Sequence, residues 1–166
     1  MKLAGLLCVV LACMGTGYLR ARHLQEQCTA LGLLCALMQD MEACIRHEQT
    51  ELTELLARMA EHPNYRRFSF LRDAADGISP LHPLREVWTG AMRSDKAVPD
   101  AAKSPLLQLG ATLGTTDTQG QLAALQLCRA MLEQAAADAR ETARTKGKLS
   151  RALGLLGGAF AAVLLM

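Results

Sequence analysis

Two patterns around His47 are the closest that this sequence comes to metal or catalytic chemistry. Cys44 and His47 are three residues apart, a spacing that puts a thiol and an imidazole on one face of a helix. A structural zinc ion takes four such ligands, and no second pair with ligand spacing occurs in the sequence. The run from His47 to Glu51 begins like a zinc-protease helix, but Glu51 stands where the second histidine belongs. The sequence therefore predicts no metal site.

Glycine-containing motifs of enzymes are missing as well. No pattern of the type G-x-x-x-x-G-K-[ST], G-x-G-x-x-G or G-x-S-x-G occurs. The stretch from Leu109 to Gly114 has two glycines but no preceding strand and no lysine, so it predicts a helix with its C-cap instead of a phosphate-binding loop. We therefore expect a protein that is not an enzyme, with no catalytic residues and no cofactor.

The composition favours a helical protein. Hydrophobic residues make up 51% of the chain but aromatic residues only 4%, so Leu, Ala and Met dominate, which suits helices better than strands. A net charge of +2 is too small for a nucleic-acid-binding protein, and we expect no nucleic-acid partner. The cysteines are too dilute for a disulfide scaffold and are predicted to be reduced thiols; they are Cys8, Cys13, Cys28, Cys35, Cys44 and Cys128.

The apolar residues are concentrated at the two ends of the sequence. Leu3 to Leu19 are seventeen residues without a charge, and Ala152 to Met166 are fifteen. A helix needs about 20 apolar residues to cross a bilayer, with a range of about 17 to 25. We therefore predict an N-terminal transmembrane anchor over residues 1–19, a body over 20–151 and a short C-terminal transmembrane anchor over 152–166.

A signal peptide is the alternative for the first segment. Val10 to Cys13 loosely resembles a lipoprotein cleavage site, in which Cys13 would carry the lipid. Leu11 is unusual in that motif, and cleavage before Cys13 would leave a signal of only twelve residues. An exported soluble protein also has no need of a second hydrophobic segment. These points favour an uncleaved anchor.

Basic residues flank both apolar segments on their inner sides. Cationic flanks stay on the cytoplasmic side of a membrane, so the body is predicted to be cytoplasmic and to meet the lipid headgroups with these bases; Lys2 is a single charge against this orientation. Gly154 and Gly158 form a GxxxG pair, which favours helix packing within the membrane. The membrane-facing bases are Arg20, Arg22, Arg140, Arg144, Lys146, Lys148 and Arg151.

The body reads as an antiparallel bundle of about six helices, which makes the protein all-α. All five prolines lie between Pro63 and Pro105, so long helices are allowed only outside that stretch. Apolar residues at helical spacing begin at Leu24, and Thr50 is the expected N-cap of a second helix that ends near Pro63. Further helices are expected over 65–75, 81–92 and 103–113, and a last helix from residue 116 or 117 is expected to run into the C-terminal anchor. The expected core positions are Leu31, Leu34, Met38, Met41, Ile45, Leu52, Leu55, Leu56 and Met59, and then Leu122, Leu125, Cys128, Leu132, Ala135 and Ala139.

The most specific motif lies between the last two helices of the body. Leu109-Gly110-x-x-Leu113-Gly114-x-x-Asp117-x-x-x-Gln121 combines a glycine that can end a helix, an N-capping aspartate and a glutamine one turn into the next helix. Its residue types fit a structural turn that sets the angle between two helices. A docking motif for a partner is the competing interpretation.

On this motif, the Tyr18-to-Leu24 run, the Leu/Met-rich first helix and Trp88, the whole chain resembles the stage III sporulation protein AB family of endospore-forming bacteria. Two positions depart from the family pattern: Thr50-Glu51-Leu52 lacks the usual proline, and Leu109 stands where a phenylalanine is usual. The resemblance implies an integral protein of the cell membrane, with its body in the mother-cell cytoplasm, in the channel complex between mother cell and forespore.

The same resemblance implies a function and partners. The family's cytosolic domain is similar to the inner-membrane platform proteins of type II secretion and type IV pilus systems, which hold a cytosolic ATPase against the membrane. The implied partners are stage III sporulation protein AA as that ATPase, other channel subunits and membrane lipid, and a homo-oligomer in the complex stays open. Two alternatives remain at this stage: a generic helical membrane adaptor, and an exported lipoprotein with a helical domain. Topology separates the second from the others.

Overall fold

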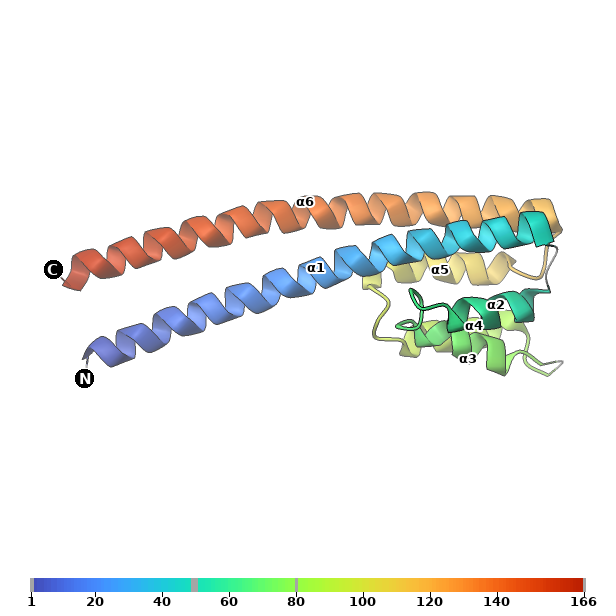
Figure 1. Ribbon diagram of the computed structural model, residues 1–166, viewed down its shortest axis with the longest axis horizontal. Helices are drawn as coiled ribbons and strands as arrows, with labels where there is room; N and C mark the ends of the chain where they lie inside the picture. Colours follow the sequence, from blue (N-terminus) through green and yellow to red (C-terminus); the bar gives the residue numbers. More distant parts are fainter. Residues whose placement is uncertain (1, 49–50, 80, 166) are drawn as a thin grey trace. The chain divides into compact units, whose positions relative to one another are not determined.

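The protein is all-α and has six helices in the part of the chain that the structure describes. A computed structural model describes residues 2–48, 51–79 and 81–165, and among these the side chains of 22–47, 51–79 and 81–145. The helices are α1 (Lys2–Glu48), α2 (Leu52–Glu61), α3 (Ser69–Gly77), α4 (Leu84–Ser94), α5 (Asp100–Thr112) and α6 (Thr118–Leu165) (Figure 1). The pairing of Ser79 with His82 is the one β-bridge in the described residues, and it closes a turn.

The chain divides into two compact units. One is Thr29–Ala136, which contains α2 to α5 with one end each of α1 and α6. The other consists of Met1–Cys28 and Ala137–Met166, which are the remaining parts of α1 and α6. The terminal apolar segments are thus continuous with α1 and α6 instead of forming helices of their own. The domain division at residues 19 and 151 stays a prediction.

The core of Thr29–Ala136 is built from the apolar faces that the helical spacing predicts. On α1 the residues Leu31, Leu34, Met38, Met41 and Ile45 are all buried, as expected. The expected stripe on α2 is buried from Leu55 onward, whereas Leu52 is half-buried. On α6 the buried residues are Leu122, Leu125, Cys128, Leu132 and Ala136, so Ala136 takes the place expected for Ala135. The N-cap of α2 is Glu51, which makes no side-chain cap, in place of the expected Thr50, which lies outside the described residues.

Three helices begin at residues other than the sequence pattern predicts. The helix expected from Tyr65 begins at Ser69, because the N–H groups of Tyr65 and Phe68 bond to carbonyls three residues back in successive turns. The helix expected from Leu81 begins at Leu84, after the Ser79–His82 turn. The helix expected from residue 103 begins at 100 and continues through Pro105, which is buried. Because proline suits the first turn of a helix, Pro105 led to a predicted helix start at residue 103, later than the start at Asp100 in the structure.

Helices α3 and α4 form an antiparallel hairpin with an aromatic interior. The rings of Phe70 and Trp88 meet edge-on at 5.2 Å between centroids. At one end of the hairpin a β-carbon on Gly77 would lie 2.5 Å from a methyl group of Val87, so the helices touch there. At the other end the buried carboxylate of Asp95 accepts hydrogen bonds from the backbone N–H groups of Phe70 (3.1 Å) and Ala97 (2.7 Å). Since Phe68, the N-cap of α3, makes no side-chain cap, Asp95 supplies a cap for α3 from the end of α4.

Tyr65 fastens the α2–α3 connection to α1. Its ring is buried, and its hydroxyl donates a hydrogen bond of 2.5 Å to Oδ2 of Asp40. Burial, and then the hydrogen bond and negative charge of Asp40, raise the pKa of Tyr65 above its ordinary value. The phenol therefore stays neutral, and remains a donor, throughout the physiological pH range.

Candidate functional site

Gly110, the first glycine of the sequence motif, lies where α4 meets α5. The indole ring of Trp88 rests against the backbone of α5, and its Nε1–H donates a hydrogen bond of 2.8 Å to the carbonyl of Leu106. A β-carbon on Gly110 would lie 2.2 Å from Cδ1 of Trp88, so the ring occupies the space that any other residue would need. Leu109 and Leu113 flank this contact and are 2% and 1% exposed, respectively. Gly110 thus leaves the space that the indole ring occupies against α5, and Leu109 and Leu113 are buried residues on either side of it in the sequence.

Gly114 ends α5 in a left-handed backbone conformation. Its φ is 75°, a region that glycine enters without the steric cost that other residues meet. The preceding N–H, of Leu113, bonds to the carbonyl of Leu109 and closes the last turn of the helix. A β-carbon on Gly114 would also lie 3.2 Å from Cδ2 of Leu52, which brings the start of α2 close to this turn.

Asp117 and Gln121 complete the turn at the start of α6. Oδ1 of Asp117 accepts a hydrogen bond of 3.0 Å from the N–H of Gly120, which is the geometry of an N-cap. Nε2 of Gln121 donates to the carbonyl of Thr116 at 3.1 Å and so holds the loop against the first turn of the helix. The motif residues Leu109, Gly110, Leu113, Gly114, Asp117 and Gln121 therefore all make contacts within the chain.

These contacts lead to a prediction for the turn. Gly114→Ala should lower the free energy of unfolding by about 1–2 kcal/mol, the usual cost of a left-handed residue with a β-carbon. Asp117→Ala should lower it by about 1 kcal/mol through loss of the cap. Thermal melts of the full-length protein in detergent, followed by far-ultraviolet circular dichroism, measure both effects. The control is Gln119→Ala, an exposed position in the same turn. If both variants melt like the parent while spore formation fails, the turn is a docking site.

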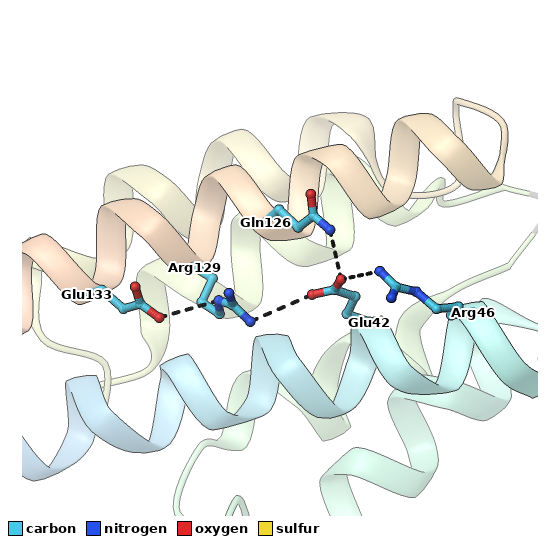
Figure 2. Close-up of polar contacts among 5 residues, drawn as sticks. All are labelled: Glu42, Arg46, Gln126, Arg129 and Glu133. Atoms are coloured by element: carbon cyan, nitrogen blue, oxygen red, sulfur yellow. Dashed lines mark hydrogen bonds and ion pairs between the residues drawn. The ribbon is translucent and has the colours of Figure 1, made fainter.

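A polar cluster joins α1 to α6 (Figure 2). Oε1 of Glu42 accepts hydrogen bonds from Nη2 of Arg46 at 2.6 Å and from Nε2 of Gln126 at 2.8 Å. Oε2 of the same carboxylate lies 3.8 Å from Nη1 of Arg129, whose Nε is 3.3 Å from Glu133. The Glu42 side chain is only 13% exposed, so solvent screens these interactions incompletely. One carboxylate thus connects the first and last helices of the protein.

Sequence reasoning had no signal for this cluster. Glu42 and Arg46 stand four residues apart, a common pair on a solvated helix face. Gln126 is 84 residues from Glu42 in the chain, and nothing in the local pattern relates the two.

The predicted membrane-facing bases fall partly outside the described side chains. Arg22 pairs with Glu26 at 3.2 Å, and both side chains are exposed. Arg140 and Arg144 are exposed on α6. The remaining bases of the set and the glycine pair of the C-terminal anchor lie outside the described side chains; they are Arg20, Lys146, Lys148, Arg151, Gly154 and Gly158.

One described segment is long and apolar enough to cross a membrane, and it lies near the N-terminus. It is Arg22–His47 of α1, with 26 residues; the described part of α6 has no such segment. Core residues of this segment, such as Leu34 and Met38, are fully buried against the other helices, and Glu42 lies in the polar cluster. We therefore assign the part of this segment from Thr29 onward to the core of the body. The predicted anchors, residues 3–19 and 152–166, lie on helix ends whose side chains the structure does not describe, and they stay predictions.

Metal-ligating and nucleophilic side chains are scattered in the described part of the chain. Among the described side chains, no three of the His, Cys, Asp and Glu type come together as a metal site. Cys44 is half-buried and its sequence neighbour His47 is exposed. Burial, and to a lesser degree the nearby Cys35, raise the pKa of the Cys128 thiol to about 12. Cys128 is therefore an unreactive, protonated core residue at neutral pH.

The helices and their contacts define a class of protein: a small helical body whose first and last helices are continuous with apolar terminal segments. The family described as stage III sporulation protein AB matches residues 2–166, and this chain belongs to that family. A stage III sporulation protein AB from Bacillus subtilis (strain 168) is 28% identical over 172 residues, covering 100% of this chain and 99% of the relative. No solved structure matches the chain.

Proposed function

We propose that this protein is a non-enzymatic platform subunit of the channel complex between mother cell and forespore, and that endospore formation requires it. The family match over residues 2–166 supports a role in stage III of sporulation. The proposal adds a mechanical role: the body holds a cytosolic secretion-type ATPase, stage III sporulation protein AA, beside the membrane. Membrane lipid and other channel subunits are the further partners.

The continuity of the two long helices is the observation that carries this proposal. α1 runs from Lys2 to Glu48, and α6 from Thr118 to Leu165, so each joins a terminal apolar segment to the body without a break. Within the body, the Glu42 cluster joins α1 to α6. Each terminal segment is therefore joined to the body through a helix whose other end lies in the core, as a platform subunit requires.

The proposal predicts that the protein retains the ATPase on membranes. We expect liposomes containing the full-length protein, in the orientation that exposes the body, to carry purified ATPase to the top of a density gradient. Liposomes without the protein should leave the ATPase at the bottom.

A body that faces the outside of the cell, detected by reporter fusions at residues 60 and 100, would favour the exported lipoprotein instead. If the protein binds an unrelated integral membrane protein and does not bind the ATPase, the generic adaptor is favoured.

A further inference from the structure

Four bases gather at one end of the α3–α4 hairpin. Arg66 and Arg67 lie in the turn just before α3, and Arg93 and Lys96 lie at the end of α4 and just beyond it. The hydrogen bond from the Phe70 N–H to the Asp95 carboxylate joins these two segments, so both pairs of bases flank one junction. We call these four residues the basic corner.

The charge of the basic corner is not neutralised within the described part of the chain. All four side chains are exposed, and none forms an ion pair with a side chain that the structure describes. Asp95, the acid between Arg93 and Lys96, is buried and already accepts two backbone hydrogen bonds. Three of the four bases are arginines, whose planar guanidinium groups pair with carboxylates through two parallel hydrogen bonds.

Fold stability does not account for where two of these bases lie. The N-terminal end of a helix carries a partial positive charge, so Arg66 and Arg67 stand at the end of α3 where a cation is least favourable. The guanidinium of Arg67 lies 5.6 Å from the centre of the Phe68 ring, which helps to hold it in place.

The aromatic residues next to the basic corner are buried. Its backbone is anchored by Tyr65, Phe68 and Phe70, each of which is 1% exposed or less. An amphipathic surface that inserts into a bilayer combines bases with exposed aromatic or aliphatic side chains, and the three aromatic side chains at this corner are buried. A cluster of arginines without such inserting side chains suits an acidic protein surface, where arginine pairs with carboxylates.

We propose that the basic corner, Arg66, Arg67, Arg93 and Lys96, is a docking surface for an acidic segment of a partner protein. The proposal rests on the proposed function only in that a platform needs a docking surface on its body. It assigns the arginines to carboxylate recognition and gives the partner a stated chemistry, namely clustered Asp and Glu side chains.

Lys96 allows the corner to be tested in the full-length protein. A glutamate-rich peptide is added to the protein in phosphatidylcholine nanodiscs, and a carbodiimide then couples the peptide's carboxylates to nearby lysines. Mass spectrometry compares the adduct at Lys96 with the adduct at Lys103. Lys103 is an internal control, because its amine already pairs with Asp100 at 2.7 Å.

We expect the adduct at Lys96 to exceed that at Lys103. Arg66→Gln together with Arg67→Gln should lower the Lys96 adduct about two- to thirtyfold, since two exposed ion pairs are lost, and should leave the Lys103 adduct unchanged. The matched control Arg85→Gln, an exposed arginine at the other end of the hairpin, should change the Lys96 adduct less than about twofold.

Three results would overturn the proposal. The first is equal labelling of Lys96 and Lys103. The second is a Lys96 adduct that survives the double substitution in a protein with a parental circular dichroism spectrum. The third is strong protection of Lys96 by phosphatidylglycerol vesicles, which would assign the corner to the membrane. None of these measurements uses the ATPase, so this inference and the proposed function can fail separately.

Discussion

Replacing Gly110 by alanine should lower the free energy of unfolding by about 2–3 kcal/mol, because the new methyl group would overlap the indole ring of Trp88. The β-carbon would lie 2.2 Å from Cδ1 and 2.6 Å from Nε1 of that ring. Neither side can move away easily, since Trp88 is fully buried and its Nε1–H is bonded to the carbonyl of Leu106. In an ordinary helix position the same substitution would stabilise the protein by about 1 kcal/mol.

Gly90→Ala is the matched control for this prediction. Gly90 lies inside α4, it is exposed, and no atom lies within 4 Å of the position that its β-carbon would take. The two substitutions are chemically identical, so they should change the stability in opposite directions. Chemical denaturation of the full-length protein in detergent gives both free energies, and the fluorescence of Trp88, the single tryptophan, reports the displacement of the ring. A Gly110→Ala variant as stable as Gly90→Ala would show that the indole does not rest on α5.

Asp95→Ala should cost about 2–4 kcal/mol of unfolding free energy, the second large effect that the structure predicts. The substitution removes the acceptor for the N–H groups of Phe70, at a buried site, and of Ala97, at a half-buried one, and leaves both donors without that partner. Hydrogen bonds to a charged group contribute about 1.5–3 kcal/mol, and an unsatisfied buried donor adds its own desolvation cost. The loss also uncouples α3 from the end of α4.

Two further variants make the Asp95 prediction sharp. Asp95→Asn keeps the shape and one acceptor oxygen, so its cost should fall between those of the parent and of Asp95→Ala. Asp73→Ala removes an exposed carboxylate from α3 and should stay within about 0.5 kcal/mol of the parent. Chemical denaturation followed by circular dichroism ranks the three variants. Equal stability of the Asp95 and Asp73 alanine variants would contradict the role of Asp95 as a cap for α3.

Local sequence patterns were sufficient for the class of fold and for much of the core. Spacing of three and four residues correctly identifies the buried face of α1 from Leu31 to Ile45 and that of α6 from Leu122 to Leu132. The absence of breakers predicts the long α6, and it equally permits the unbroken α1. Helix starts were predicted less well, because Tyr65 and Leu81 satisfy the apolar spacing and yet lie in turns.

The motif from Leu109 to Gln121 contains both residues whose role could be predicted from the sequence and one whose role could not. Its turn residues could be interpreted from the sequence, since a glycine that ends a helix and an aspartate that begins one act on their near neighbours. The role of Gly110 could not be interpreted in this way, because the glycine is needed to make room for the ring of Trp88, a residue on another helix.

The all-helical class, the buried stripes and the terminal apolar segments could be predicted because they depend on residue types within a few positions of one another, and the family from motifs spread along the chain. Contacts between distant positions could be seen only in the folded protein. Tyr65 bonds to Asp40 and Phe70 to Asp95, each across 25 residues, and Gln126 bonds to Glu42 across 84. A sequence does not show whether a charged or polar side chain is solvated or hydrogen-bonded to a distant residue. The packing of the helices determines which of the two occurs.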